Sequence, residues 1–151
     1  MRLTIAAIVT VAVMWLGALQ STTRADDAWR SVWDGVYTKE QQGRGQALYN
    51  QQCSACHGDM LTGGDAAPAL AGGEFLANWN GLTVGDLFER VRKTMPLSKP
   101  GKLSRQVNAD IVAYILNVNR FPTGSTELPC DTELLKQIRL EMVRPEEQKK
   151  Q

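Results

Sequence analysis

The chain has 151 residues, a formal net charge of +1 and 22% charged side chains. It therefore lacks the strongly basic balance of a nucleic-acid-binding protein. Its length suffices for one small domain, and it contains no internal repeat.

Residues 1–25 have the pattern of an export signal. Arg2 gives a positive start, residues 3–19 carry no charge, and Ala25 is a small residue suited to cleavage. The uncharged run is at the low edge of the length that spans a bilayer, so an uncleaved anchor is the alternative. In either case we expect the rest of the chain in the periplasm or at the outer face of the cytoplasmic membrane.

Residues 26–37 predict an extended N-terminal arm that lays its aromatic side chains on the domain surface. Next, Thr38 and Gln41 fit a capping box, which predicts a helix that runs to about Gln52. Gly45 stands four residues before Tyr49 on the same face of this helix. We expect Gly45 to mark a close crossing with a second helix.

The helix leads into Cys53-Ser54-Ala55-Cys56-His57, which contains the only histidine and two of the three cysteines. On a helical turn, residues at i, i+3 and i+4 share one face, so two thiols and an imidazole can address one flat ligand. Cys-x-x-Cys-His is the attachment signal of c-type haem. It predicts one covalent haem c, bound through Cys53 and Cys56, with His57 on the iron.

Two other interpretations use the same residues. A thioredoxin-like redox pair is expected beside a βαβ pattern, which is missing near Cys53. A structural zinc site could combine Cys53, Cys56 and His57 with Cys130. However, Cys130 lies far away in a polar tail, and the paired spacing of a zinc finger is missing. We therefore favour haem and expect Cys130 to be a free thiol.

Two further helices and a tail follow. Residues 58–73 predict a glycine-rich loop. Thr83 to Asp86 cap a short helix, and Ser104 opens a longer helix over roughly residues 105–119 with one apolar stripe. In the tail, residues 122–151, we expect one helical turn from Asp131 and a disordered end at residues 145–151. No convincing strand is present, so the predicted class is all-α.

The second axial ligand of the iron follows by elimination. Without another histidine, the candidates are the five methionines, Met1, Met14, Met60, Met95 and Met142. The first two belong to the export segment, Met60 is too near His57 to reach the opposite haem face, and Met142 lies in the charged tail. Met95 remains, restricted by Pro96; the alternative is an ordinary core methionine. His/Met ligation leaves no open position and predicts an electron carrier.

Basic residues flank Met95. They are Arg90, Arg92, Lys93, Lys99, Lys102 and Arg105, against the acids Asp86 and Glu89. We expect them to form a positive rim that steers an acidic redox partner. The alternative is that they are solvated surface residues.

From Thr38 to Phe121 the sequence resembles the class I c-type cytochromes. The motifs that carry the resemblance are Gly45/Tyr49, Cys53-Ser54-Ala55-Cys56-His57-Gly58, Ala67-Pro68-Ala69-Leu70, Thr94-Met95-Pro96 and Ala113-Tyr114. The resemblance implies a small cytochrome c fold over residues 38–121, with a few helices around one haem. It also implies that Gly45 and Tyr49 meet Ile111, Tyr114 and Ile115 where the first and last helices cross.

The resemblance further assigns roles to three residues. It implies that the Pro68 carbonyl accepts a hydrogen bond from Nδ1–H of His57, which fixes the imidazole. It implies that Leu70 packs on the haem and that the Trp79 indole N–H reaches a haem propionate. A packing or surface role is the alternative for Trp79.

A narrower similarity concerns the redox partners. Residues 81–88, Met95-Pro96 and Lys99-Pro100-Gly101 resemble cytochrome domains found with bacterial quinoprotein dehydrogenases. The sequence lacks their propeller domain, so we expect any dehydrogenase to be a separate chain. The predicted function is a non-enzymatic electron carrier between a periplasmic dehydrogenase and an oxidase or another cytochrome.

Two alternatives stay open. One is a haem-based gas sensor or peroxidase-like enzyme with a labile Met95, although no second histidine is available for acid–base work. The other is a permanent electron-transfer subunit of a larger enzyme.

Overall fold

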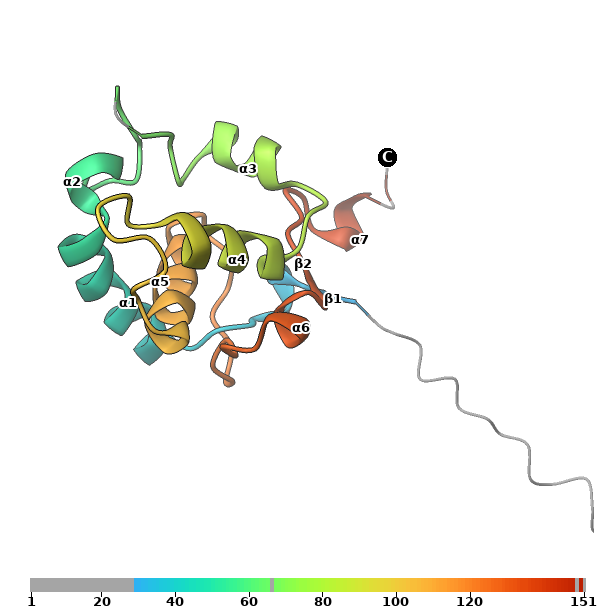
Figure 1. Cartoon of the computed structure of the whole chain (residues 1–151). Helices are drawn as coiled ribbons and strands as arrows, with labels where there is room; N and C mark the ends of the chain where they lie inside the picture. The colour runs from blue at the N-terminus through green and yellow to red at the C-terminus, as the bar shows by residue number, and fades with distance from the viewer. Residues whose placement is uncertain (1–28, 66, 149, 151) are drawn as a thin grey trace, which may run out of the picture.

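The computed structural model describes residues 29–65, 67–148 and 150. Its elements are, in order, β1 (Arg30–Ser31), the 3-10 helix η1 (Val32–Asp34), α1 (Lys39–Gln52), α2 (Ser54–His57), α3 (Gly73–Trp79), α4 (Val84–Thr94), α5 (Arg105–Val118), α6 (Thr132–Leu135), β2 (Ile138–Arg139) and α7 (Pro145–Gln148). Helices dominate and surround one core, which confirms the all-α class (Figure 1). The predicted export signal lies outside the described residues.

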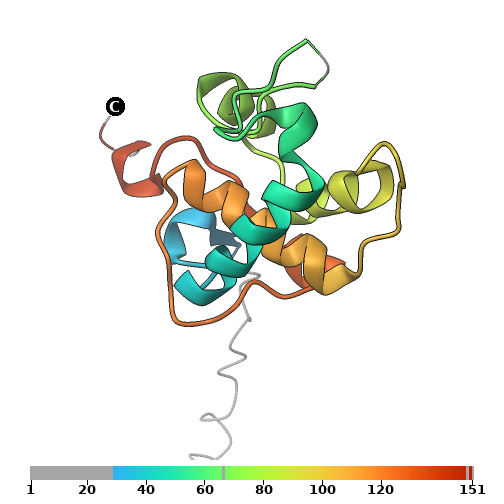
Figure 2. The same cartoon turned by 90° about the vertical axis from the view of Figure 1, so that its left-hand side faces the viewer.

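The crossing of α1 and α5 organises the fold (Figure 2). Gly45 is buried there, and a Cβ at this position would overlap the carbonyl oxygen of Asp110 on α5. Only glycine therefore allows the two backbones to approach this closely. One turn later, the rings of Tyr49 and Tyr114 lie 5.4 Å apart. The predicted crossing at Gly45 is confirmed.

Helix α4 packs beside this pair, between α5 and α6. Its start is fixed by a reciprocal capping box, in which Thr83 and Asp86 each bond the other's backbone N–H. Leu87, Phe88 and Val91 are buried, as their spacing predicted. The capping box thus fixes the start of α4, and its buried side chains fix its apolar face against the core.

The N-terminal arm and the C-terminal tail belong to the same core. Val32 and Tyr37 of the arm and Leu135 and Ile138 of the tail are at most 1% exposed. β1 and β2 pair in parallel, although no strand was predicted; strands of two residues are too short to show a period. The predicted limits of the cytochrome domain, residues 38 and 121, stay a prediction. The hydrophobic core, however, includes residues before and after these limits.

Gln41 explains part of this packing and corrects the predicted capping box. Thr38 does cap α1 by accepting from the Gln41 N–H at 3.1 Å. The Gln41 side chain, however, is fully buried and bonds Leu128, donating to its carbonyl at 3.0 Å and accepting from its N–H at 2.7 Å. A buried amide needs both a donor and an acceptor, and the Leu128 backbone supplies the two together.

Three helices lie where none was predicted. The 3-10 helix η1 lies in the arm that was expected to be extended, α3 follows the glycine-rich loop, and α7 begins the end of the chain that was expected to be disordered. The guanidinium of Arg144, just before α7, lies 4.9 Å from the centre of the Trp33 ring. Among the described residues, no helix is long and apolar enough to cross a membrane.

Candidate haem site

The Cys-x-x-Cys-His motif forms one tight turn at the end of α1. The Cys53 carbonyl accepts from the N–H groups of Cys56 at 3.1 Å and His57 at 3.0 Å. Both cysteines are free thiols, Cys53 half-buried and Cys56 exposed. Burial, with a smaller contribution from Cys56, raises the pKa of the Cys53 thiol to about 11, so this thiol is protonated at neutral pH.

His57 is buried, and one of its ring nitrogens is occupied. Nδ1 lies 2.8 Å from the Pro68 carbonyl oxygen. A carbonyl only accepts, so Nδ1 donates, which in a neutral imidazole leaves the lone pair on Nε2. No hydrogen bond is made by Nε2 to any described residue. This is the tautomer that a metal ligand needs, and it contains the bond that the resemblance implied.

Residues 58–72, here named the histidine-side loop, hold Pro68 in place. The Leu61 carbonyl accepts from Leu70 N–H at 2.8 Å and from Ala71 N–H at 3.2 Å, which closes the loop. Gly63 N–H donates to the His57 carbonyl at 2.9 Å. At the loop's base, the Tyr49 hydroxyl donates to the Gly58 carbonyl at 2.7 Å. The loop is therefore bonded to itself, to α1 and to the motif.

Residues 95–104, here named the methionine-side loop, begin with Met95 as the C-cap of α4. The Met95 N–H donates to the Val91 carbonyl at 2.9 Å, and its partly buried side chain packs against the core. Only two backbone bonds lie within this loop, Lys99 to Pro96 at 2.9 Å and Lys102 to Lys99 at 3.3 Å. Residues 97–102 are exposed.

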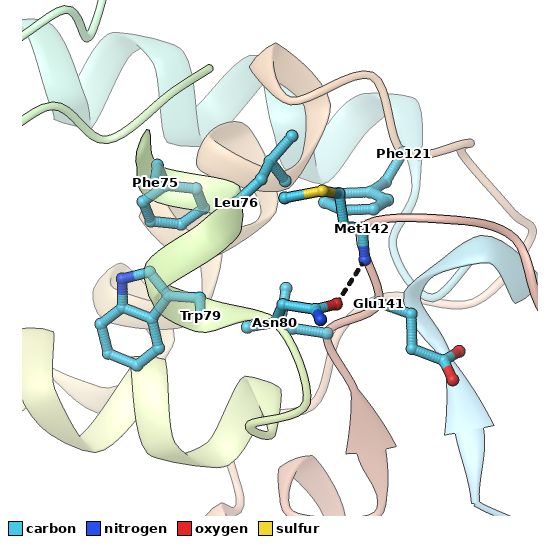
Figure 3. A pocket seen from close by; sticks show the side chains of 8 residues that line it. Phe75, Leu76, Trp79, Asn80, Phe121, Glu141 and Met142 are labelled. Atoms are coloured by element: carbon cyan, nitrogen blue, oxygen red, sulfur yellow. Dashed lines mark hydrogen bonds between the residues drawn. The ribbon is translucent and has the colours of Figure 1, made fainter. Parts of the chain in front are cut away.

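Trp79 ends α3 and is partly buried, next to Phe75 at 6.1 Å between ring centres. In Figure 3 its indole nitrogen lies on the side of the ring away from Asn80 and Met142. In Figure 3 this N–H bonds none of the residues drawn, so it is available as a donor. The shallow depression in Figure 3 contains Trp79 but neither cysteine of the motif, His57 nor Met95.

The site residues fit a haem. Cys53, Leu70, Trp79 and Met95 all pack at the margin of the core and are only partly buried. Partly exposed apolar side chains of this kind are suited to contact with a large flat apolar group, and the free Nε2 of His57 offers a ligand to its iron. The residues that the sequence analysis selected thus share the features that such a group requires.

The zinc alternative has no support in the described part of the chain. No three His, Cys, Asp or Glu side chains come together there in a way that could hold one metal ion. Cys130 lies beside the start of α5 instead, where its carbonyl accepts from Arg105 Nε at 2.7 Å. Cys130 forms no disulfide with another described residue, and a free thiol stays a prediction.

The basic residues near Met95 fall into two groups. Arg92 and Lys93 each lie 2.9 Å from a Glu89 carboxylate oxygen, and Arg105 bonds the tail. The hydrogen bonds from Arg92, and after it Lys93, hold the pKa of Glu89 well below its usual range. Three cations, Arg90, Lys99 and Lys102, form no ion pair or side-chain hydrogen bond with another described residue. The histidine-side loop, by contrast, carries two acids and no base.

One residue of the site was missed. The buried side chain of Asn119 bonds the histidine-side loop, although the sequence placed Asn119 at the end of a helix with no assigned role. Asparagine is common at helix ends because it tolerates unusual backbone angles. Its presence there therefore gives no reason to expect a contact with another segment. A polar residue directly after an apolar stripe was the one available signal.

Comparison with known proteins gives the family. A solved structure that matches is that of the sulfane dehydrogenase SoxCD from Paracoccus pantotrophus, with 25% identity and a TM-score of 0.46, covering 72% of this chain and 61% of that chain. The chain thus spans less than two thirds of the matched chain. No curated protein matches. Residues 40–115 match the family model described as cytochrome c oxidase, cbb3-type, subunit III. The chain therefore belongs to this family, and its resemblance to the class I c-type cytochromes is confirmed.

Proposed function

We propose that this chain is an exported monohaem cytochrome c that carries single electrons between a periplasmic donor and a respiratory acceptor. Membership of a cytochrome c family indicates electron transfer and implies haem c. The observation that carries the proposal is the motif turn itself. It presents two free thiols beside a histidine whose Nδ1 is occupied and whose Nε2 is free.

The residues of the chain divide the work between them. Cys53 and Cys56 would hold the haem through thioethers, and His57 and Met95 would bind its iron. Leu70 would pack on the haem and Trp79 would donate to a propionate. When bound, the haem supplies one-electron cycling between Fe(III) and Fe(II).

The two ligands act differently on the iron. The bond from His57 to Pro68 fixes the imidazole and raises its basicity. The soft Met95 thioether would favour ferrous iron and raise the reduction potential. With His57 and Met95 both bound to the iron, no site would be left for a substrate. We therefore propose that the chain is not itself an enzyme.

Mass spectrometry of the denatured protein tests the cofactor. Expressed in a host that matures c-type cytochromes, the chain should retain one haem, and the Cys53→Ala/Cys56→Ala variant should retain none. The reduced protein should not bind carbon monoxide, because Met95 occupies the sixth position. A measured mass equal to that of the polypeptide without haem would contradict the proposal. Rapid carbon monoxide binding would favour the gas-sensor or peroxidase-like alternative.

We place the redox partner at the methionine-side loop and expect its surface to be acidic. The support is the set of unpaired cations, Arg90, Lys99 and Lys102, whereas the histidine-side loop carries Asp59 and Asp65. A positive rim accelerates encounter with a negative partner more than it raises affinity. The donor we favour is a separate periplasmic dehydrogenase; the alternative of a permanent enzyme subunit uses the same face.

Small oxidants of opposite charge test this face without a known partner. Lys99→Glu/Lys102→Glu should slow reduction of anionic ferricyanide and accelerate reduction of cationic tris(phenanthroline)cobalt(III). Both effects should be about threefold or more at low salt and fade where the Debye length falls below about 10 Å. Lys39→Glu/Lys150→Glu is the control, because it makes the same charge change on other segments. Equal effects of the two pairs would exclude a local role for the loop.

Export is tested by the start of the mature chain. Cleavage of the signal should give a protein that begins near Asp26 and is released with the periplasmic fraction. A protein that begins at Met1 and sediments with membranes indicates an anchor instead. A cytoplasmic product without haem contradicts both forms of the proposal.

A further inference from the structure

Asn119 connects the end of α5 to the histidine-side loop. It is 8% exposed. Its Oδ1 accepts from Gly72 N–H at 3.1 Å, and its Nδ2 donates to the Leu70 and Ile115 carbonyls, both at 2.9 Å. One end of the amide thus bonds the loop alone, and the other bonds the loop and the helix together. Every polar atom of this buried side chain has a partner.

The bonds reach the segment that holds His57. Leu70 is fixed from two sides, because its carbonyl accepts from Asn119 and its N–H donates to Leu61. Pro68 precedes Leu70 by two residues, and its carbonyl is the partner of His57 Nδ1. The position of that carbonyl therefore depends on how firmly Asn119 and Leu61 hold the loop.

The imidazole is positioned by the same helix through another route. α5 crosses α1 at Gly45, and α1 leads directly into the turn that carries His57. Helix α5 thus positions both partners of the His57–Pro68 bond. It positions the imidazole through the helix crossing and the carbonyl through Asn119. A change at Asn119 would move one partner and leave the other in place.

We propose that Asn119 is a positioning residue that sets the hydrogen bond between Pro68 and His57, and through it the reduction potential. The proposal rests on the proposed function, since His57 acts there as the iron ligand. A strong bond at Nδ1 makes the imidazole more basic and favours Fe(III). Loosening the Pro68 carbonyl weakens that bond, so loss of the Asn119 amide should raise the potential.

The test compares Asn119→Ala with Asn117→Ala in the haem-loaded protein. Asn117 lies in the same last turn of α5, but its Nδ2 donates to the Tyr37 hydroxyl at 3.3 Å, away from the loop. Asn119→Ala should raise the reduction potential and accelerate amide hydrogen exchange of Gly72 about tenfold or more. Asn117→Ala should leave both values unchanged, although it can lower Tm.

Asn119→Leu removes both ends of the amide at nearly constant volume and serves if the alanine variant fails to fold. Because it adds no charge near the haem, it should raise the potential and accelerate Gly72 exchange as the alanine variant does. A lower Tm in Asn119→Ala with an unchanged potential would show a purely structural role and overturn the proposal. A wild-type protein without covalent haem would instead overturn the proposed function, because exchange at Gly72 can still be measured there.

Discussion

The two loops beside the haem site differ in how firmly the fold holds them. The histidine-side loop is closed at Leu61, bonded to His57 through Gly63 and Pro68, and tied to α5 by Asn119. The methionine-side loop has two backbone bonds of its own and exposed side chains from residue 97 to residue 102, and Asn108 of α5 bonds only its last two residues, Leu103 and Ser104. The protein alone therefore orients His57, one of the two proposed ligands, and anchors Met95, the other, mainly through the end of α4.

This difference between the loops predicts which of the two proposed ligands is released first when the fold is disturbed. The orientation of His57 depends on a bond between the buried imidazole and the carbonyl of the exposed Pro68, which the loop network supports from several sides. Met95 has its N–H fixed by Val91, while the chain that follows is exposed. Local opening is easiest where few buried contacts and cross-links exist. We expect disturbance of the fold to release Met95 before His57.

The largest expected effect is the loss of the methionine ligand with retention of the cofactor. Met95→Ala should keep one covalent haem, because both thiols and His57 are untouched. It should abolish the weak near-infrared sulfur-to-iron band of the oxidised protein and let the reduced protein bind carbon monoxide. The control is Met60→Ala, whose side chain is 74% exposed and should leave the spectrum unchanged. A band that persists in Met95→Ala refutes the assignment.

A smaller effect compares one glycine from each loop. Gly63 (φ +70°) and Gly101 (φ +72°) both have left-handed backbones, but their surroundings differ. A Cβ on Gly63 would press on the Pro68–Ala69 backbone, whereas a Cβ on Gly101 would find its nearest atom, the Arg92 carbonyl oxygen, at 3.9 Å. Alanine should thus cost about 1 kcal/mol at residue 101, from the backbone alone, and about 3 kcal/mol or more at residue 63.

Denaturant unfolding of the two haem-loaded variants measures these costs. Gly63→Ala should also raise the reduction potential, because the clash displaces the carbonyl that bonds His57. Gly101→Ala should not change the potential. If the two substitutions cost the same free energy, the histidine-side loop is not the firmer one and the comparison fails.

The sequence was sufficient to predict the parts of the fold that depend on local chemistry. The caps at Thr38, Thr83 and Ser104 mark the starts of α1, α4 and α5 because a side-chain oxygen satisfies backbone donors a few residues away. The crossing at Gly45 was predicted because glycine within a helix needs a packing reason. These signals lie within one or two turns of the residues that they specify.

The missed features depend on contacts between distant segments. Gln41 reads as a capping residue, yet it bonds Leu128, and Asn119 reads as a helix end, yet it bonds Leu70. The tail reads as polar because its buried residues, such as Leu135 and Ile138, are separated by charged ones. A sequence gives no sign of which distant backbone carbonyl a buried amide will meet. The haem ligands could be proposed, but the network that holds them could not.

The smallest expected effect concerns acid and the methionine side. Glu89 of α4 accepts from Arg92 at 2.9 Å and from Thr132 at 2.8 Å, and pairs with Lys93 at 2.9 Å. These bonds lower its pKa below the unfolded value of about 4.3, so Glu89 stabilises the fold above that pH and stops doing so as pH falls through its lower folded pKa. Glu89→Gln should therefore reduce the free energy of unfolding by about 1 kcal/mol at neutral pH, a difference that shrinks in acid.

Thermal unfolding of wild type and Glu89→Gln from pH 7 to pH 2 measures this difference, with Glu133→Gln as the control. Glu133 also pairs with a lysine, Lys136 at 2.9 Å, but its side chain is 77% exposed, so its loss should change little.

Because Glu89 ties α4 to α6 ahead of Met95, acid should weaken the sulfur-to-iron band in wild type before the haem leaves His57. In Glu89→Gln the band should already be weaker at neutral pH and depend less on acid. If the band depends on acid equally in the two proteins, Glu89 does not affect the binding of Met95 to the iron. The easier release of Met95 would then be due to the methionine-side loop alone.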